Sequence, residues 1–194
     1  MHYLLGLESL PGFRLERLAS LLTGAQGRPV TVSAREFFLL DAADASPVGD
    51  RLRRLLHAGP FDPAAGAADE YFVLPRAGTR SAWSSKAADI LARCGFEGIR
   101  RIERGLRLQL QGLDGESLVP DAERALHDRM TDSLVRDPAM LAGWFEPAPP
   151  AALESIALGD DPRAALARAN RERGLALSED EIAYLADAYR WLGR

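Results

Sequence analysis

The chain has 194 residues, of which 47% are hydrophobic and 27% are charged, and its net charge is -4. A chain of this length buries about two thirds of its unfolded surface, which predicts one main domain and a partial second one. The slightly acidic balance gives no broad positive field, so we expect no nucleic-acid partner. The N-terminus lacks the basic segment and long apolar run of a secretory signal, and no stretch reaches membrane-spanning length. We therefore expect a soluble, cytoplasmic protein with no membrane partner.

The sequence of residues 1–135 predicts an alternation of strands and helices. Apolar residues recur at helical spacing in some segments and form short strand-like runs in others. The order is strand, helix, strand, helix, and it occurs twice, on either side of a Gly/Pro/Ala-rich connection at 59–68. The predicted elements are strand 2–8, helix 14–22, strand 30–41, helix 51–57, strand 70–75, helix 84–94, strand 99–111 and helix 120–127.

An offset of the sequence against itself by 70 residues, from Arg54 to Arg124, brings similar residues together. It places Arg54, Leu56 and His57 on Arg124, Leu126 and His127. We interpret residues 1–135 as a duplication with halves at about 1–60 and 69–135. Four strands with helices on one face predict an α+β fold of ferredoxin-like layers, and two such halves predict a pseudo-twofold axis.

A different segment follows the duplicated region. Residues 136–159 are rich in proline and predict a connection, and residues 160–194 predict a helical segment. The sequence Asp160-Asp161-Pro162 is typical of a helix start, and Gly174 of a helix end. Ser178 and Glu181 have the spacing of a capping box. The apolar residues after 183 have little left to cover them, so we expect a partner and a domain that is truncated at the C-terminus.

Few residues in the chain suggest chemistry. There is no Gly-rich phosphate loop and no Gly-x-Ser-x-Gly elbow. Cys94 is the only cysteine, which excludes an internal disulfide and fits a reducing cytoplasm, and we expect it to be a buried structural thiol. His57 and His127 occupy equivalent places in the two halves, which favours a structural or capping role. We expect no catalytic residue and no metal site in this chain.

The segment Trp83–Ile90 is the strongest candidate for a functional site. It contains Lys86, the only lysine among 24 basic residues. Ser84 or Ser85 is expected to cap the following helix, whose free backbone amides attract anions. Arg76, Arg80 and Lys86 add positive charge, and Trp83 offers an apolar anchor. Interdomain docking, simple helix capping and a small-anion site all fit this pattern.

The segment Arg101–Gly105 is a second candidate. Strand alternation places Arg104 on the same face as Ile102 and Leu106, where a guanidinium needs a partner, and Glu103 points to the other face. Arg104 either pairs with an acid inside the fold, emerges at the strand end toward another domain, or is solvated at a twisted edge. Gly105 would allow a close backbone approach or a bulge.

Four motifs carry a resemblance to a known family. They are Trp83–Ile90, Arg101–Gly105, Leu126-His127-Asp128-Arg129-Met130-Thr131, and Gly174–Ile182. In this order they resemble the N-terminal region of the large phosphoribosylformylglycinamidine synthase. That region in turn resembles a dimer of the small separate subunit used by some bacteria.

The resemblance implies a role in purine biosynthesis. The family's enzyme uses ATP and glutamine to convert formylglycinamide ribonucleotide to its amidine. Its synthetase and glutaminase regions are the implied partners of this chain, which would dock them and support ammonia transfer without catalysing a step. No cofactor is expected in this segment, and ATP and magnesium are implied for the rest of the enzyme. The alternative is a stand-alone ferredoxin-like regulatory module that binds a small anionic metabolite.

Overall fold

The computed structural model describes residues 1–43, 48–66, 69–147 and 149–193. Two compact units are distinguished, Met1–Ala148 and Pro149–Arg194. The expected connection at 136–159 begins inside the first unit, where Leu141 and Trp144 are buried.

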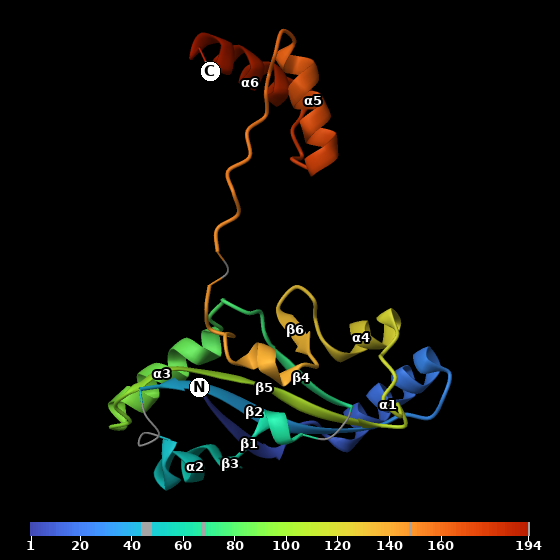
Figure 1. The fold of residues 1–194 in the computed structure, drawn as a ribbon, viewed down its shortest axis with the longest axis vertical. Helices are drawn as coiled ribbons and strands as arrows, with labels where there is room; N and C mark the ends of the chain where they lie inside the picture. The colour runs from blue at the N-terminus through green and yellow to red at the C-terminus, as the bar shows by residue number, and fades with distance from the viewer. Residues whose placement is uncertain (44–47, 67–68, 148, 194) are drawn as a thin grey trace. The chain divides into compact units, whose positions relative to one another are not determined.

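The first unit consists of two similar series of elements (Figure 1). The first series is β1 (His2–Glu8), α1 (Gly12–Gln26), β2 (Thr31–Ala42), α2 (Asp50–Leu56), β3 (Gly59–Pro60) and the 3-10 turn η2 (Pro63–Ala65). The second series is β4 (Glu70–Pro75), α3 (Ala82–Arg93), β5 (Ile99–Gln111), α4 (Pro120–Leu126), β6 (Asp132–Val135) and the 3-10 turn η3 (Pro138–Leu141).

The strands form one antiparallel sheet of order β3-β1-β2-β5-β4-β6. This sheet confirms the predicted α+β class. The count of four strands was wrong, because each half adds a short third strand, β3 or β6, at an edge of the sheet. These strands are two and four residues long, too short to give an alternating pattern.

The helix starts repeat with the predicted shift, whereas the starts of the paired strands do not. α1 and α3 begin at Gly12 and Ala82, and α2 and α4 span Asp50–Leu56 and Pro120–Leu126. Both pairs are related by the same shift that places His57 on His127. The long strands β2 and β5 pair at the centre of the sheet. β1 and then β3 follow on the side of β2, and β4 and then β6 follow in the same order on the side of β5. The pseudo-twofold axis stays an interpretation, which this order favours.

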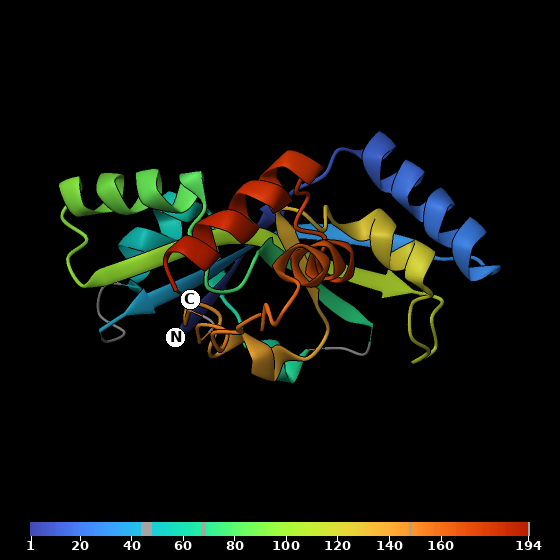
Figure 2. The same cartoon turned by 90° about the horizontal axis from the view of Figure 1, so that it is seen from above.

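Three apolar clusters hold the unit together. α1 and α4 pack over one end of the helix-covered face, around Leu22, Leu108 and Ala122. α2 and α3 pack over the other end, around Leu52 and Leu91. Figure 2 shows α1 beside α4, with α3 at the opposite end of the sheet. Each of these two clusters therefore combines one helix from each half.

The opposite face of the sheet carries the third cluster. The side chains of a strand alternate between the two faces, so Phe37 and Leu39 of β2 point away from the helices. They are fully buried under Leu141 and Trp144, which follow β6 in the chain. The segment 138–145 therefore completes the core instead of linking two units.

The second unit contains two helices, α5 (Pro162–Arg173) and α6 (Glu179–Trp191). The predicted caps are confirmed. Asp161 accepts a hydrogen bond from the amide of Ala164, Gly174 has the left-handed conformation (φ 63°), and Ser178 and Glu181 form the capping box. Ala165, Leu166 and Ala186 are buried between the helices, and Trp191 is 85% exposed.

Candidate functional site

The start of α3 is fixed to β5 by one serine. The Oγ of Ser81 accepts a hydrogen bond from the amide of Ser84 and donates one to the Oε2 of Glu103 at 2.6 Å. The amide of Ser81 donates to the Oε1 of Glu103 at 3.0 Å. The expectation that Ser84 or Ser85 caps this helix was wrong. The helix begins at Ala82, because Glu103 selects Ser81 for the cap position.

Glu103 is a fully buried carboxylate with a charged partner. The Nη2 of Arg101 lies 3.0 Å from its Oε1 and also donates to the carbonyl of Thr79. The Arg101 guanidinium lies over the ring of Phe145, 4.3 Å from the ring centre. A buried charge is tolerated when it is paired and hydrogen-bonded, and Glu103 meets both conditions. The motifs at 83–90 and 101–105 are therefore connected by one network of hydrogen bonds, which joins the loop before α3 to β5.

Arg104 and Trp83 come together on the helix-covered face. The Arg104 guanidinium lies 5.2 Å from the centre of the Trp83 ring, and its Nη1 lies 3.5 Å from the Oε1 of Glu36 on β2. Arg104 therefore has an acidic partner, Glu36, in the same sheet, which agrees with the first of the three interpretations in the pairing but not in the burial of the guanidinium. The Arg104 side chain is nevertheless 48% exposed, so the pair is also accessible from outside.

The remaining predicted residues at the start of α3 differ in their exposure. Ser84 is buried, and its Oγ has no hydrogen-bond partner among the described residues. Ser85, Arg80 and Lys86 are exposed. In the described part of the chain, neither Arg80 nor Lys86 forms an ion pair. These two cations, together with Trp83 and Arg104, are called the α3 surface below.

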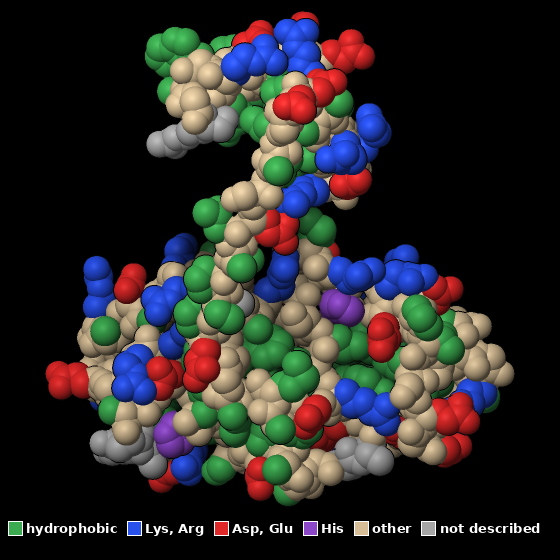
Figure 3. Space-filling model, turned by 45° about the horizontal axis from the view of Figure 1, so that its top comes forward, with side chains coloured by type: hydrophobic (Ala, Val, Ile, Leu, Met, Phe, Trp, Pro, Cys, Tyr) green, Lys and Arg blue, Asp and Glu red, His purple; other side chains and the backbone are tan. Residues whose placement is uncertain are grey.

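Arg76 belongs to a different place, a cavity of about 540 Å³ between α4 and β6. On the face drawn in Figure 3, blue side chains of Lys and Arg lie near one of the histidines that are visible. This α4–β6 cavity was not predicted, since Arg76 is distant in sequence from the other lining residues, which lie between Pro120 and Leu134. The charged and polar residues that line it are Arg76, Glu123, Arg124, His127, Arg129 and Asp132.

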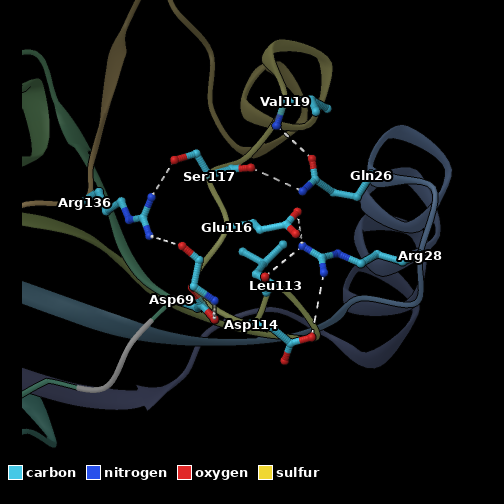
Figure 4. Close-up of polar contacts among 10 residues, drawn as sticks. Gln26, Arg28, Asp69, Leu113, Asp114, Glu116, Ser117, Val119 and Arg136 are labelled. Carbon is cyan, nitrogen blue, oxygen red and sulfur yellow. Dashed lines mark hydrogen bonds and ion pairs between the residues drawn. The ribbon is translucent and has the colours of Figure 1, made fainter.

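A polar network holds the loop 113–119, which joins β5 to α4 (Figure 4). Arg28 donates to the carbonyl of Leu113 at 2.8 Å and to the Oε2 of Glu116 at 2.6 Å. Gln26 accepts from the amide of Val119 at 2.8 Å, and Arg136 donates to the Oγ of Ser117 at 2.9 Å. Sequence reasoning missed this network because its members are far apart along the chain. It fixes α4, and with it one wall of the α4–β6 cavity.

Cys94 differs from the expectation. It is exposed, so its interpretation as a buried structural thiol was wrong. α3 ends at Arg93, and the chain turns at Gly95 (φ 76°) so that Phe96, and not Cys94, reaches the core. The capping positions of the two histidines are confirmed, since His57 and His127 directly follow α2 and α4.

A comparison with protein families gives one match. Residues 36–145, more than half of the chain, match the family described as formylglycinamide ribonucleotide amidotransferase N-terminal. The matched range begins in β2 and ends after η3, so it includes the start of α3, its Glu103 anchor and the α4–β6 cavity. Among the described residues, no helix is long and apolar enough to span a bilayer, and no group of three potential metal ligands is found.

Proposed function

Because this chain belongs to the formylglycinamide ribonucleotide amidotransferase N-terminal family, we propose that it is the docking segment of such an enzyme. The enzyme is an amidotransferase of purine biosynthesis. In this proposal, glutamine is the amido donor, and the chain supports ammonia transfer by joining the synthetase and glutaminase regions. The chain itself catalyses no step, ATP and magnesium bind to other regions, and the enzyme works in the cytoplasm.

The α3 surface is the observation that carries the docking proposal. Arg80 and Lys86 are exposed cations without acidic partners in the described part of the chain, and they lie close in sequence to Trp83. Tryptophan and arginine are the residues most often found at the energetic centre of protein interfaces. Charged groups around such a centre set its orientation and partner. The complementary surface is therefore expected to be acidic.

The rigid support of this surface favours docking over simple helix capping. Capping requires only Ser81, whereas Glu103 and Arg101 are buried at the same point and hold the loop 76–81 to β5. A surface whose backbone is already ordered loses less entropy when it binds.

Charge reversal in the whole amidotransferase tests the docking role. The double variant Arg80→Glu/Lys86→Glu changes exposed residues, so its fold should persist. We expect glutamine-dependent synthesis to fall about tenfold or more, a change equivalent to ~1.4 kcal/mol of lost docking energy. Synthesis with added ammonium salt should be unchanged, since free ammonia needs no docked glutaminase. Arg14→Glu/Arg17→Glu is the matched control, because these arginines are exposed on α1, the equivalent helix of the first half.

Two outcomes would contradict this proposal. One is equal loss with glutamine and with ammonia, which would place the effect in the synthetase chemistry or in folding. The other is unchanged glutamine-dependent activity in the Arg80/Lys86 variant.

The single lysine allows a second, independent measurement. Lys86 is the only side-chain amine of this segment, so acylation by an amine-specific reagent has one side-chain target, which mass spectrometry locates directly. We expect Lys86 to be acylated in the isolated segment and protected in the intact enzyme. Equal acylation of Lys86 in both would exclude it from the interface.

A second candidate function is favoured by the α4–β6 cavity. Its cluster of arginines supports the alternative of a module that binds a small anionic metabolite. This alternative does not require the α3 surface, and the two functions can therefore be tested separately.

A further inference from the structure

We infer that the α4–β6 cavity binds the oxyanion group of a small metabolite, with Arg76 and Arg129 as its contacts. The cavity of about 540 Å³ has the size of a small-molecule site. The inference stands on the residues of this cavity alone, and it does not depend on the docking proposal.

Arg76 and Arg129 are the cations available to a ligand. They lie on different segments, at the end of β4 and in the turn before β6, and both line the same cavity. Neither has an ion-pair partner among the residues that the structure describes, whereas Arg124 is paired with Asp121. Both guanidinium groups are exposed and line the same cavity, so they are accessible to an anion that enters it. Their planar donors suit phosphate and carboxylate oxygens.

Hydrogen bonds hold together the two backbone segments that carry the arginines before any ligand binds. The amide of Arg76 donates to the carbonyl of Thr131 at 3.1 Å, which ties the end of β4 to the turn that carries Arg129. Within that turn, the amide of Met130 donates to the Oδ1 of Asp128 at 2.8 Å. Behind Arg76, the Nε1 of Trp144 donates to the carbonyl of Pro75 at 3.0 Å. The distance between the two segments is thereby fixed, which lowers the entropic cost of binding.

The acids of the cavity restrict the kind of ligand. Glu123 and Asp132 also line it, and neither forms an ion pair in the described part of the chain. Asp132 accepts a hydrogen bond from the hydroxyl of Thr131 at 3.1 Å, and the Glu123 carboxylate accepts none from the described residues. A bare anion offers no further donor to either carboxylate. A small molecule that carries hydroxyl or ammonium groups beside its phosphate or carboxylate satisfies both kinds of lining residue.

The three histidines of the chain give a direct readout. His127 lines the cavity, and its ring is held by a contact of 3.0 Å between Nδ1 and the carbonyl oxygen of Glu123. His57 occupies the equivalent position in the first half and is an internal control. The imidazole resonances of the whole chain are to be followed by NMR at fixed pH during titration with inorganic phosphate, with acetate as the carboxylate probe. Sodium chloride at matched ionic strength is the reference.

We expect phosphate or acetate to shift the His127 resonance saturably, with the His57 resonance unchanged. Saturation by phosphate alone indicates a phosphorylated ligand, and saturation by acetate indicates a carboxylate ligand. The double variant Arg76→Gln/Arg129→Gln should weaken the affinity about tenfold or more. Arg14→Gln/Arg17→Gln removes the same charge from an exposed face of α1 and should bind as the unmodified chain does.

Three results would overturn the inference. They are a linear response to both anions, an equal response to chloride, and unchanged affinity in the Arg76/Arg129 variant. Should that variant fail to fold, as judged by its circular dichroism, each single substitution is measured in its place. Unchanged affinity in both single variants overturns the inference equally.

Discussion

The two halves of the first unit start their long helices in different ways. In the first half, α1 follows Pro11 and has no side-chain cap. In the second half, α3 follows Ser81, whose hydroxyl caps the helix and also binds the buried Glu103. The counterpart of Glu103 in the first half is Ser33, which has no charge to bury. A shared framework thus carries a buried polar anchor in one half only, at the segment where the candidate docking residues are concentrated.

The strand pairs differ as well. The β1–β2 pair has a register shift between Leu5 and Glu8, and there Arg35 of β2 donates to the carbonyl of Gly6. The β4–β5 pair is in regular register up to Leu106, beside Gly105, which is the counterpart of Arg35 in the duplication. The side chain of Arg35 is accommodated in the first half because the β1–β2 pair bulges beside it. A side chain at position 105 is excluded in the second half because the described register of the β4–β5 pair has no such shift.

Gly105→Ala should give the largest effect. A Cβ at this position would lie 2.2 Å from the carbonyl oxygen of Val73 and 2.6 Å from the Cδ2 of Leu74. We expect a loss of about 4 kcal/mol in the free energy of unfolding, or failure to fold. Urea denaturation measures it, with Gly24→Ala as control, because that glycine lies in α1 with nothing within 4 Å of the added Cβ. Similar stability of the two variants would show that the close approach of Val73 and Leu74 does not exclude a side chain at position 105.

Glu103→Gln should be nearly as severe. The substitution leaves the Arg101 guanidinium buried without its charge partner, which costs about 3–5 kcal/mol in the free energy of unfolding. Asp121→Asn is the matched control, since it breaks the exposed pair with Arg124 and should change stability by about 0.5 kcal/mol or less. Equal losses in the free energy of unfolding for the two substitutions would show that the buried Glu103–Arg101 pair contributes no more to stability than the exposed pair.

Ser81→Ala tests the cap itself. The substitution removes the hydroxyl that serves both the amide of Ser84 and Glu103, so we expect a loss of about 1–2 kcal/mol. Hydrogen exchange in the first turn of α3 should rise with it. Ser85→Ala, at the position that the sequence also suggested as a cap, should have little effect. A larger loss of stability for Ser85→Ala than for Ser81→Ala would show that Ser85 is the cap of α3.

Asp41→Asn should give the smallest effect, at the seam between the halves. Hydrogen bonds from Arg100 hold the pKa of Asp41 below its usual range. The pair therefore stabilises the fold above the ordinary carboxyl pKa, and this contribution disappears as the pH falls through the lowered pKa. We expect a small drop in melting temperature at neutral pH and none once the pH has fallen below the lowered pKa, where the carboxyl is protonated. An equal drop at both pH values would show that the ion pair is not its cause.

Local sequence patterns were sufficient to predict most of the helices and strands. The long elements were predicted because their apolar periodicity is sustained over several residues, and the caps of α5 and α6 because both are contiguous motifs. The repeat was detectable from three residues near the ends of α2 and α4. β3 and β6 were missed because strands of two and four residues have no period, and they form only against strands already in place.

The candidate sites were less predictable than the elements. Sequence spacing grouped Arg76 with Lys86 and assigned the cap to Ser84 or Ser85. In the structure, Arg76 shares a cavity with α4 and Arg129, and Glu103 fixes the cap at Ser81. Glu36 was not considered as the partner of Arg104, since these residues are distant in sequence and meet only when β2 pairs with β5.

The sequence by itself determined the class of fold, the long helices and strands, the local caps of α5 and α6, and the resemblance to the family. These depend on contacts between residues a few positions apart, or on the repetition of such contacts. Only the tertiary structure decided which serine caps α3, which acid meets Arg104, that Cys94 is exposed, and that Arg76 and Arg129 share a cavity. The reason is physical, because each of these outcomes depends on a partner that reaches its place only after the sheet has assembled.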